Sequence, residues 1–154
     1  MLSGLPSWHT GNAYNISSNA YVAGYANDAP AILTGSKADL NIHIHKANGN
    51  YLYGYGNPSS AQNDFTGPVG FQIGSRNNLR GPGYFNMDLG LGKTFPVYHN
   101  RVNLKFRADA FNAFNHPNFS LPNDTLTLTQ SQFGQITSTV NSARVLQVAL
   151  RLEF

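Results

Sequence analysis

The sequence predicts an all-β protein that folds as an antiparallel meander, and three observations support this fold class. Three segments alternate apolar and polar residues with a period of two, so that each strand has one apolar and one polar face. Only 11% of the 154 residues are charged, where about 25% is usual, and 12% are aromatic. The chain contains no run of about 18 apolar residues, the length that a transmembrane helix needs.

The first half of the chain shows the weaker patterns. Residues 12–30 are polar with interspersed tyrosines, which is typical of a loop. Residues 40–45 alternate and are followed by residues 51–55 across a turn at residues 47–50, which predicts a hairpin. Residues 57–83 are rich in Gly, Pro, Asn and Ser and predict a second long loop.

The second half contains the three clear strands, at residues 85–91, 102–110 and 146–154. Residues 95–101 form a short turn between the first two strands, and residues 112–141 form a long polar connection before the third. Long and short connections in alternation are typical of an up-and-down barrel, with loops at one end and tight turns at the other. Compact soluble domains rarely contain loops of such length.

Two folds explain these strands, because alternation alone does not say what each face contacts. In a soluble β-sandwich the apolar faces point inward, whereas in an outer-membrane barrel they point to lipid and the charged residues line the lumen. The barrel is favoured by the final aromatic Phe154, by aromatic residues clustered at strand ends, and by loops too long and polar to build a soluble core. The expected lipid-facing residues are Phe85, Met87, Leu89, Leu91, Val102, Leu104, Phe106, Leu146, Val148, Leu150, Leu152 and Phe154.

Tyrosines in the first half suggest a ligand-binding surface. Aromatic rings on an exposed loop stack on sugars and other ligands, although loop packing or a membrane-interface belt explains the same residues. The candidate binding residues are Tyr51, Tyr53 and Tyr55, together with Trp8, Tyr14, Tyr21 and Tyr25. The alternative to the barrel is therefore a soluble β-sandwich module that binds carbohydrate.

Two histidines raise the question of a metal site. His43 and His45 lie two residues apart on one strand face, a spacing that metal sites in β proteins use. Further ligands are needed, and Glu153 is the only glutamate of the chain, so two polar loop residues are the simpler interpretation. A small metal-dependent β-barrel enzyme that uses both histidines is a third hypothesis, and we assign no metal.

Charged residues on the polar faces have two interpretations. They could line a substrate path, or they could pair across strands inside a lumen. Pairing is favoured, because a partly buried charge without a partner is unfavourable. These residues are Lys105, Arg107, Asp109 and Arg151.

Other functions find no support in the sequence. The motifs of serine hydrolases and zinc proteases are absent, and residues 80–83 (RGPG) lead into a strand rather than into a phosphate-binding helix, so we expect no enzyme activity and no cofactor. The net charge of +3 comes from singly scattered basic residues, which predicts no nucleic-acid partner. The absence of cysteine excludes disulfides and thiolate metal sites. The first residues show no signal peptide.

Four short motifs in series resemble the C-terminal end of TonB-dependent receptors of the Oar-like type, which carry a carboxypeptidase-regulatory-like domain before the plug. Residues 76–89 (RNNLRGPGYFNMDL) look like the start of a late barrel strand. Residues 93–96 (KTFP) and 106–119 (FRADAFNAFNHPNF) resemble the following turn and strand. Residues 133–139 (FGQITST) and the closing strand complete the series, and residues 3–6 (SGLP) are similar to a motif in the preceding strand.

This resemblance implies a transmembrane barrel of about 22 strands, of which the chain supplies about the last four. It implies that residues 1–83 hold a strand end and a long extracellular loop, and that residues 84–154 hold the last three strands. The implied location is the outer membrane, and the implied function is energy-coupled uptake by the full-length protein. The implied partners are outer-membrane lipid, the rest of the barrel, the plug, TonB, and the barrel-assembly machinery, which would recognise Phe154. Residues 8–64 do not follow the pattern of the family.

Overall fold

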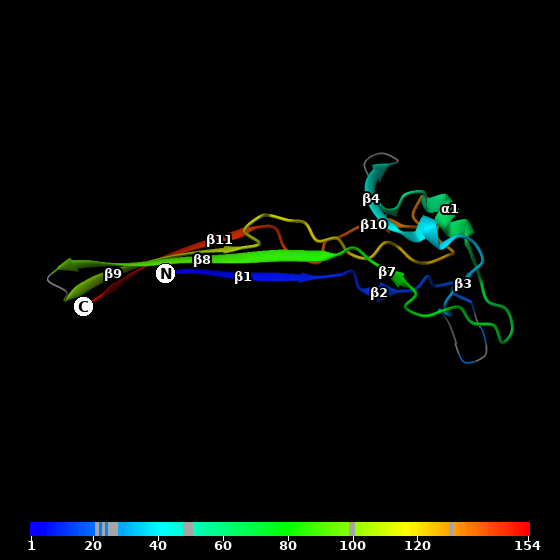
Figure 1. Cartoon of the computed structure of the whole chain (residues 1–154), viewed down its shortest axis with the longest axis horizontal. Coiled ribbons are helices and arrows are strands. Elements are labelled where there is room, and N and C mark those ends of the chain that lie inside the picture. Colours follow the sequence, from blue (N-terminus) through cyan, green and yellow to red (C-terminus); the bar gives the residue numbers. More distant parts are fainter. Residues whose placement is uncertain (21, 23, 25–27, 48–50, 99–100, 130) are drawn as a thin grey trace. The chain divides into compact units, whose positions relative to one another are not determined.

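The structure, a computed structural model, describes residues 1–20, 22, 24, 28–47, 51–98, 101–129 and 131–154 (Figure 1). The chain divides into two compact units. The sheet unit comprises Met1–His9, Tyr84–Asn118 and Thr139–Phe154. The loop unit comprises Thr10–Gly83 and Phe119–Ser138. Among the described residues, no helix is long and apolar enough to cross a bilayer.

The sheet unit is a four-stranded antiparallel sheet. Its strands lie in the order β1 (Leu2–His9), β8 (Tyr84–Tyr98), β9 (Val102–Phe111) and β11 (Val145–Glu153). The all-β prediction and the three strands of the second half are therefore confirmed. The strand β1 has no clean alternation in its sequence, and only its similarity to a family motif indicated it.

One boundary of the sheet differs from the prediction. Residues 95–98, expected in a turn, belong to β8, which has 15 residues. The reason is pairing, because Phe95 lies opposite Leu104 and the ladder continues to Tyr98 and Val102. Pro96 has no N–H to donate, and the register shifts between Pro96 and Tyr98, as expected for a proline within a strand. The remainder of the expected turn includes residues 99 and 100, outside the described residues.

The register aligns most apolar residues of all four strands on one side, with Leu5, Phe111 and Val145 on the other. Residues directly opposite each other in an antiparallel pair point to the same face of a sheet. Trp8 lies opposite Phe85, Leu91 opposite Ala108, and Phe106 opposite Leu150. We call this side the apolar face; it carries Leu2, Pro6, Trp8, Phe85, Met87, Leu89, Leu91, Phe95, Leu104, Phe106, Leu146, Val148, Leu150 and Leu152.

The loop unit contains short elements. The two strands of the predicted hairpin are confirmed as β4 (Ile42–Ala47), which lies two residues later than expected, and β5 (Tyr51–Tyr55). Residues 48–50 of the expected turn lie outside the described residues. The strand β10 (Gln135–Ile136) pairs with the other edge of β5. Two small sheets pair β2 (Ala13–Tyr14) with β7 (Leu79–Arg80), and β3 (Ile32–Leu33) with β6 (Phe65–Thr66).

Two short helices of the loop unit begin at side-chain caps. In α1 (Pro58–Asn63), Ser60 N donates to Asn57 Oδ1 at 3.1 Å, and Pro58 stands in the first turn, where no amide is needed. The 3-10 helix η1 (Lys37–Leu40) is capped by Ser36, whose hydroxyl accepts from Ala38 N at 3.2 Å.

The loop unit has a hydrophobic core, which the sequence did not predict. We expected residues 12–30, 57–83 and 112–141 to be loops that build no core. They are largely irregular in structure, but each range supplies core residues, so the second part of this expectation was wrong. Core residues come from single positions far apart in the chain, without periodicity, so no strand or helix pattern reveals them. The core consists of Tyr14, Ile16, Ala31, Leu40, Tyr55, Ala61, Phe65, Leu79 and Phe133.

Candidate functional site: the two faces of the sheet

The side chains of the apolar face are exposed or half-buried, and none of them is buried. Leu146, Val148, Leu150 and Leu152 of β11 are 54 to 69% exposed, and Leu91 of β8 is 50% exposed. Every buried apolar side chain of the described residues belongs to the loop unit. Large apolar surfaces that remain exposed in a folded chain mark contact with a membrane or with another protein. The strands thus do not form the interior of a soluble sandwich.

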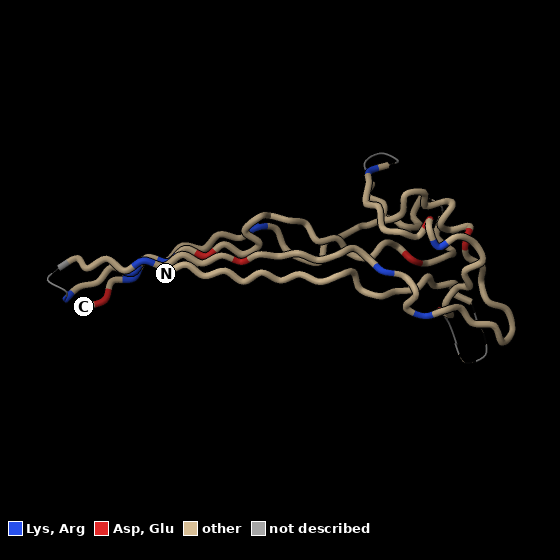
Figure 2. The backbone as a smooth tube through the Cα atoms, in the orientation of Figure 1, with Lys and Arg blue, Asp and Glu red and all other residues tan. Residues whose placement is uncertain are grey.

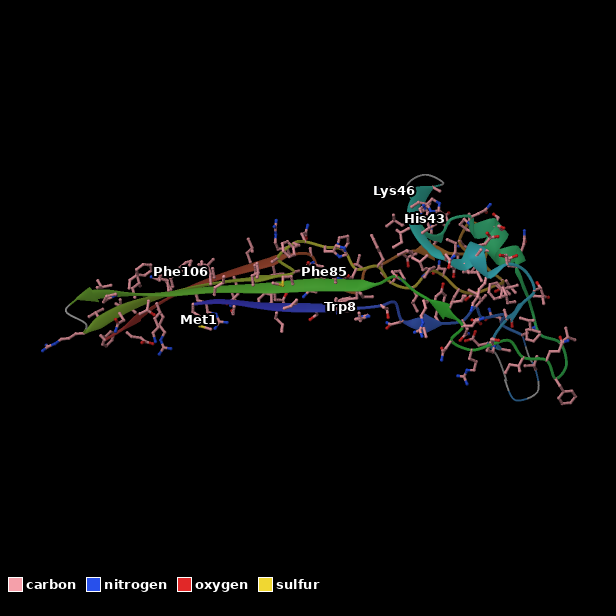
Figure 3. All side chains as sticks on the ribbon, in the orientation of Figure 1. Met1, Trp8, His43, Lys46, Phe85 and Phe106 are labelled. Carbon is pink, nitrogen blue, oxygen red and sulfur yellow. The ribbon has the colours of Figure 1, made fainter. Side chains whose placement is uncertain are left out.

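Aromatic residues border the apolar face at both ends of β8. At the start of the strand, the Phe85 ring stacks on the Phe114 ring with centroids 6.3 Å apart and meets the His116 ring edge-on at 5.9 Å. Trp8 lies opposite Phe85 on the neighbouring strand and is exposed (Figure 3). Near the other end, Lys93 Nζ lies 5.9 Å from the centroid of the Phe95 ring. An apolar band with aromatic borders is the surface pattern of a transmembrane barrel wall.

The opposite face of the sheet, the polar face, carries paired charges. Lys105 and Arg151 lie directly opposite each other, which alone would be repulsive, and Glu153 pairs with both, at 2.7 and 3.3 Å. Arg107 Nε donates to Asp109 Oδ2 at 2.7 Å within β9. Pairing across strands therefore occurs for Lys105 and Glu153, whereas Arg107 and Asp109 pair along one strand. Basic residues gather toward the end of the sheet with the β8–β9 turn (Figure 2).

Four asparagines close the opposite end of the sheet; we call them the asparagine clamp (Asn112, Asn115, Asn118 and Asn141). Asn118 is 1% exposed, and its amide donates to Phe85 O and accepts from Phe85 N, both at 2.7 Å. The side chain thus replaces a neighbouring strand for the backbone of β8. Asn141 Oδ1 accepts from Asn118 N at 2.8 Å, and Asn115 Oδ1 accepts from Arg144 N at 3.0 Å.

The conformation of the clamp explains the choice of asparagine. Asn112 and Asn115 have φ of 49° and 52°, in the left-handed region that asparagine adopts more readily than most residues. Asn112 also uses its side chain, which donates to His116 O and Ser142 O and accepts from His116 N. The clamp was not predicted, although the spacing of three residues between Asn112, Asn115 and Asn118 was a signal for it.

The tyrosines proposed to bind a ligand do not form one open surface. Tyr51 is 58% exposed, whereas Tyr53 and Tyr55 are both 0% exposed. Tyr53 donates to Ser131 O at 2.7 Å. Tyr14 joins Tyr55 in the core, with their hydroxyl oxygens 2.6 Å apart, and Trp8 belongs to the sheet unit. Tyr21 and Tyr25 lie outside the described residues.

Burial dominates the chemistry of the Tyr14–Tyr55 pair. Loss of water raises the pKa of Tyr14 to about 12, although its hydrogen bond to Tyr55 acts in the opposite direction. Burial also raises the pKa of Tyr55, further than that of Tyr14. Both rings therefore remain neutral at physiological pH and act in packing rather than in proton transfer.

The two histidines contact each other and not a third ligand. The His43 and His45 rings lie 5.9 Å apart, and His45 Nδ1 is 3.0 Å from His43 O. Within the described part of the chain, no three His, Asp or Glu side chains lie close enough together to hold a metal ion.

These features define a class of protein, because an exposed apolar face with aromatic borders, backed by a charged face, is the design of a transmembrane β-barrel wall. The comparison with known families agrees with this class. Residues 1–147 match the family model of the outer membrane beta barrel domain, so the chain belongs to that family and its location is the outer membrane. No curated protein and no solved structure matches the chain. The soluble β-sandwich module considered from the sequence is therefore wrong.

Proposed function

We propose that the chain forms the C-terminal part of the barrel of a TonB-dependent receptor of the Oar-like type, which takes up a substrate across the outer membrane in the full-length protein. The apolar face contacts lipid, the polar face lines the lumen, and the loop unit belongs to the extracellular loops. The chain itself catalyses no reaction. The family assignment supports the barrel and the location, and the four sequence motifs support the receptor type.

The observation that carries the proposal is the continuity of the apolar face over four strands in one register. A strand of 10 residues such as β9 is about 33 Å long and, tilted by about 40°, spans the apolar band of about 25 Å. Within the part of the chain that the structure describes, β1 and β11 each have a neighbouring strand on one side only. Open edges of this kind are avoided in complete proteins, so we expect further strands of the receptor to pair with them.

The connections support the orientation. Barrels of this class have short turns on the periplasmic side and long loops on the extracellular side. The β8–β9 connection is short, whereas residues 10–83 and 112–144 connect β1 to β8 and β9 to β11. The β8–β9 turn and Phe154 would therefore lie on the periplasmic side. There Phe154 and the alternating residues before it would serve as the signal for the barrel-assembly machinery.

Single cysteines test the assignment of the two faces, because the chain has none of its own. We expect a water-soluble maleimide to label Gln147→Cys, on the polar face, in intact outer membranes of cells that express the full-length receptor. We expect Val148→Cys, its neighbour on the apolar face, to resist labelling until the membrane is dissolved. Labelling of both positions to the same extent in the membrane would contradict the wall.

A second experiment tests the receptor type. Uptake by the full-length protein should cease when TonB is deleted or the proton-motive force is collapsed, while the amount of barrel in the outer membrane stays unchanged. The control is the protection of Val148→Cys from labelling, which requires the assembled wall and does not depend on energy. Uptake that continues without TonB would disprove the receptor type, but it would not contradict the assignment of the barrel wall.

A further inference from the structure

A hollow on the polar face lies at the end of the sheet that carries the asparagine clamp. It has a volume of about 340 Å³, and its floor is formed by alternate residues of β8, Tyr84, Asn86 and Asp88. Phe111 of β9 and Val145 of β11, which lie opposite each other, form another wall. Both are large apolar residues on a face that is otherwise mostly polar. Binding sites typically combine such apolar walls with a few placed polar groups.

The polar groups of the hollow are held in position. Asp88 Oδ1 accepts from Asn112 N at 2.8 Å and from Asn86 Nδ2 at 3.0 Å, which fixes the carboxylate plane. Within the described residues, Asp88 Oδ2, Asn86 Oδ1 and the Tyr84 hydroxyl have no hydrogen bond. The hollow therefore presents two fixed acceptors and a hydroxyl group to whatever enters it.

The aromatic side of the hollow is also oriented. The Tyr84 ring stacks on the His9 ring of β1, with centroids 5.0 Å apart and planes 3° from parallel. This stack favours one orientation of the Tyr84 ring. Phe111 supplies a second ring that is exposed at the same end of the sheet.

The charge of the hollow selects among ligand classes. Among the described residues, Asp88 is the one charged residue that lines the hollow, and no Lys, Arg or His lines it. An anionic ligand would meet a carboxylate without a compensating cation, which disfavours it. An organic cation would find the carboxylate and the aromatic rings, but a quaternary ammonium group has no N–H to donate to Asp88 Oδ2 or Asn86 Oδ1. A ligand that has hydroxyl donors next to an apolar ring face would fit the acceptors and the aromatic rings of the hollow.

We propose that this hollow binds an uncharged saccharide, with the hydroxyls donating to Asp88 and Asn86 and a sugar ring lying against Tyr84. The inference rests on the proposed function for one point, which is that the polar face lines the lumen and is reached from outside. It adds the chemical class of the ligand. The residues concerned are distinct from Tyr51, Tyr53 and Tyr55 of the loop unit.

The test uses the full-length receptor in detergent micelles, with cellobiose, maltose and N-acetylglucosamine as probes and choline as the cationic comparison. Titrations are followed by the amide resonances of residues 84–88. We expect at least one sugar to shift these resonances in a saturable way. Asp88→Asn keeps an acceptor for Asn112 N, so the fold is retained, and it should weaken sugar binding by about tenfold.

Matched tyrosine variants give the second arm. Tyr84→Leu should weaken sugar binding by about tenfold or more, whereas Tyr51→Leu, the same change at an exposed tyrosine outside the hollow, should leave it unchanged. Binding of choline instead of the sugars, binding of none of the three sugars, or sugar binding unaffected by both hollow variants would overturn the proposal. Cysteine labelling decides the orientation of the face independently, so failure here is distinguishable from failure of the wall.

Discussion

The sheet unit and the loop unit use their apolar residues in opposite ways. In the sheet unit the apolar side chains alternate along the strands and are exposed or half-buried. In the loop unit they are scattered among Gly, Asn, Ser and Thr, and they meet in a buried core. The regular pattern thus marks the surface that faces lipid in our proposal, and the irregular one marks the interior that excludes water. Periodicity alone does not identify a core.

The largest effect should come from the core of the loop unit. Phe133 is 0% exposed and its ring lies 5.7 Å from that of Tyr55. Phe133→Ala should lower the free energy of unfolding of the loop unit by about 3–5 kcal/mol, because a buried ring leaves a cavity. Amide hydrogen exchange of the refolded chain measures the stability of each unit separately. We expect protection to fall in the loop unit and to persist in β8 and β9; loss in both would show that the units do not fold separately.

The sheet unit should respond next, and only on one face. Leu150→Arg or Leu104→Arg should cost about 2–4 kcal/mol near the middle of the membrane, because the charge enters hydrocarbon. Gln147→Arg and Asn103→Arg, on the polar face, should cost far less. Unfolding of the protein in lipid bilayers by denaturant measures the difference. Equal costs on the two faces would mean that the apolar residues of the sheet unit do not face lipid, which would contradict the contrast with the loop unit.

The asparagine clamp provides a smaller effect. Asn118→Ala leaves the N–H and C=O of Phe85 without their partners, and an unsatisfied buried group costs about 1–3 kcal/mol. Asn103→Ala, a substitution on the polar face for which the structure shows no side-chain hydrogen bond among the described residues, is the control. Thermal unfolding in detergent should show a lower midpoint for the first variant only. A similar shift in both variants would mean that the clamp adds nothing specific.

The smallest effect depends on pH and lies in the loop unit. Burial, and to a smaller extent Asp28, raises the pKa of the Asp124 carboxyl above its ordinary value of 3.8. The folded state therefore binds this proton more tightly than the unfolded state, and stability falls as pH rises from about 3.8 through the folded pKa.

Asp124→Asn should accordingly raise the midpoint of thermal unfolding slightly at pH 7. The gain should disappear below pH 3.8, where the carboxyl of the wild type is protonated in both states. Unfolding midpoints of both proteins at the two pH values measure this. The same gain at both values would assign the effect to packing and not to charge.

The sequence was sufficient to predict those strands that have a pattern or motif within their own residues. Alternation predicted β9 and β11 closely, and the family motifs indicated β1, whose Gly4 and Pro6 interrupt the pattern. The core of the loop unit was not predictable, since Ile16, Ala31 and Phe133 come together only through contacts distant in sequence. The site on the polar face was missed because Tyr84, Asp88 and Phe111 look like ordinary strand residues, and only the register brings them together.

The origin of the loop-unit core has a consequence for evolution of the protein. Its residues come from both long connections: Gln62 of the first donates to Leu126 O and Leu128 O of the second, and β10 of the second pairs with β5 of the first. Connections that each fold alone are free to change length and sequence separately. Here an insertion or deletion in one connection alters the packing of the other, so the two are expected to diversify together, as a single inherited module.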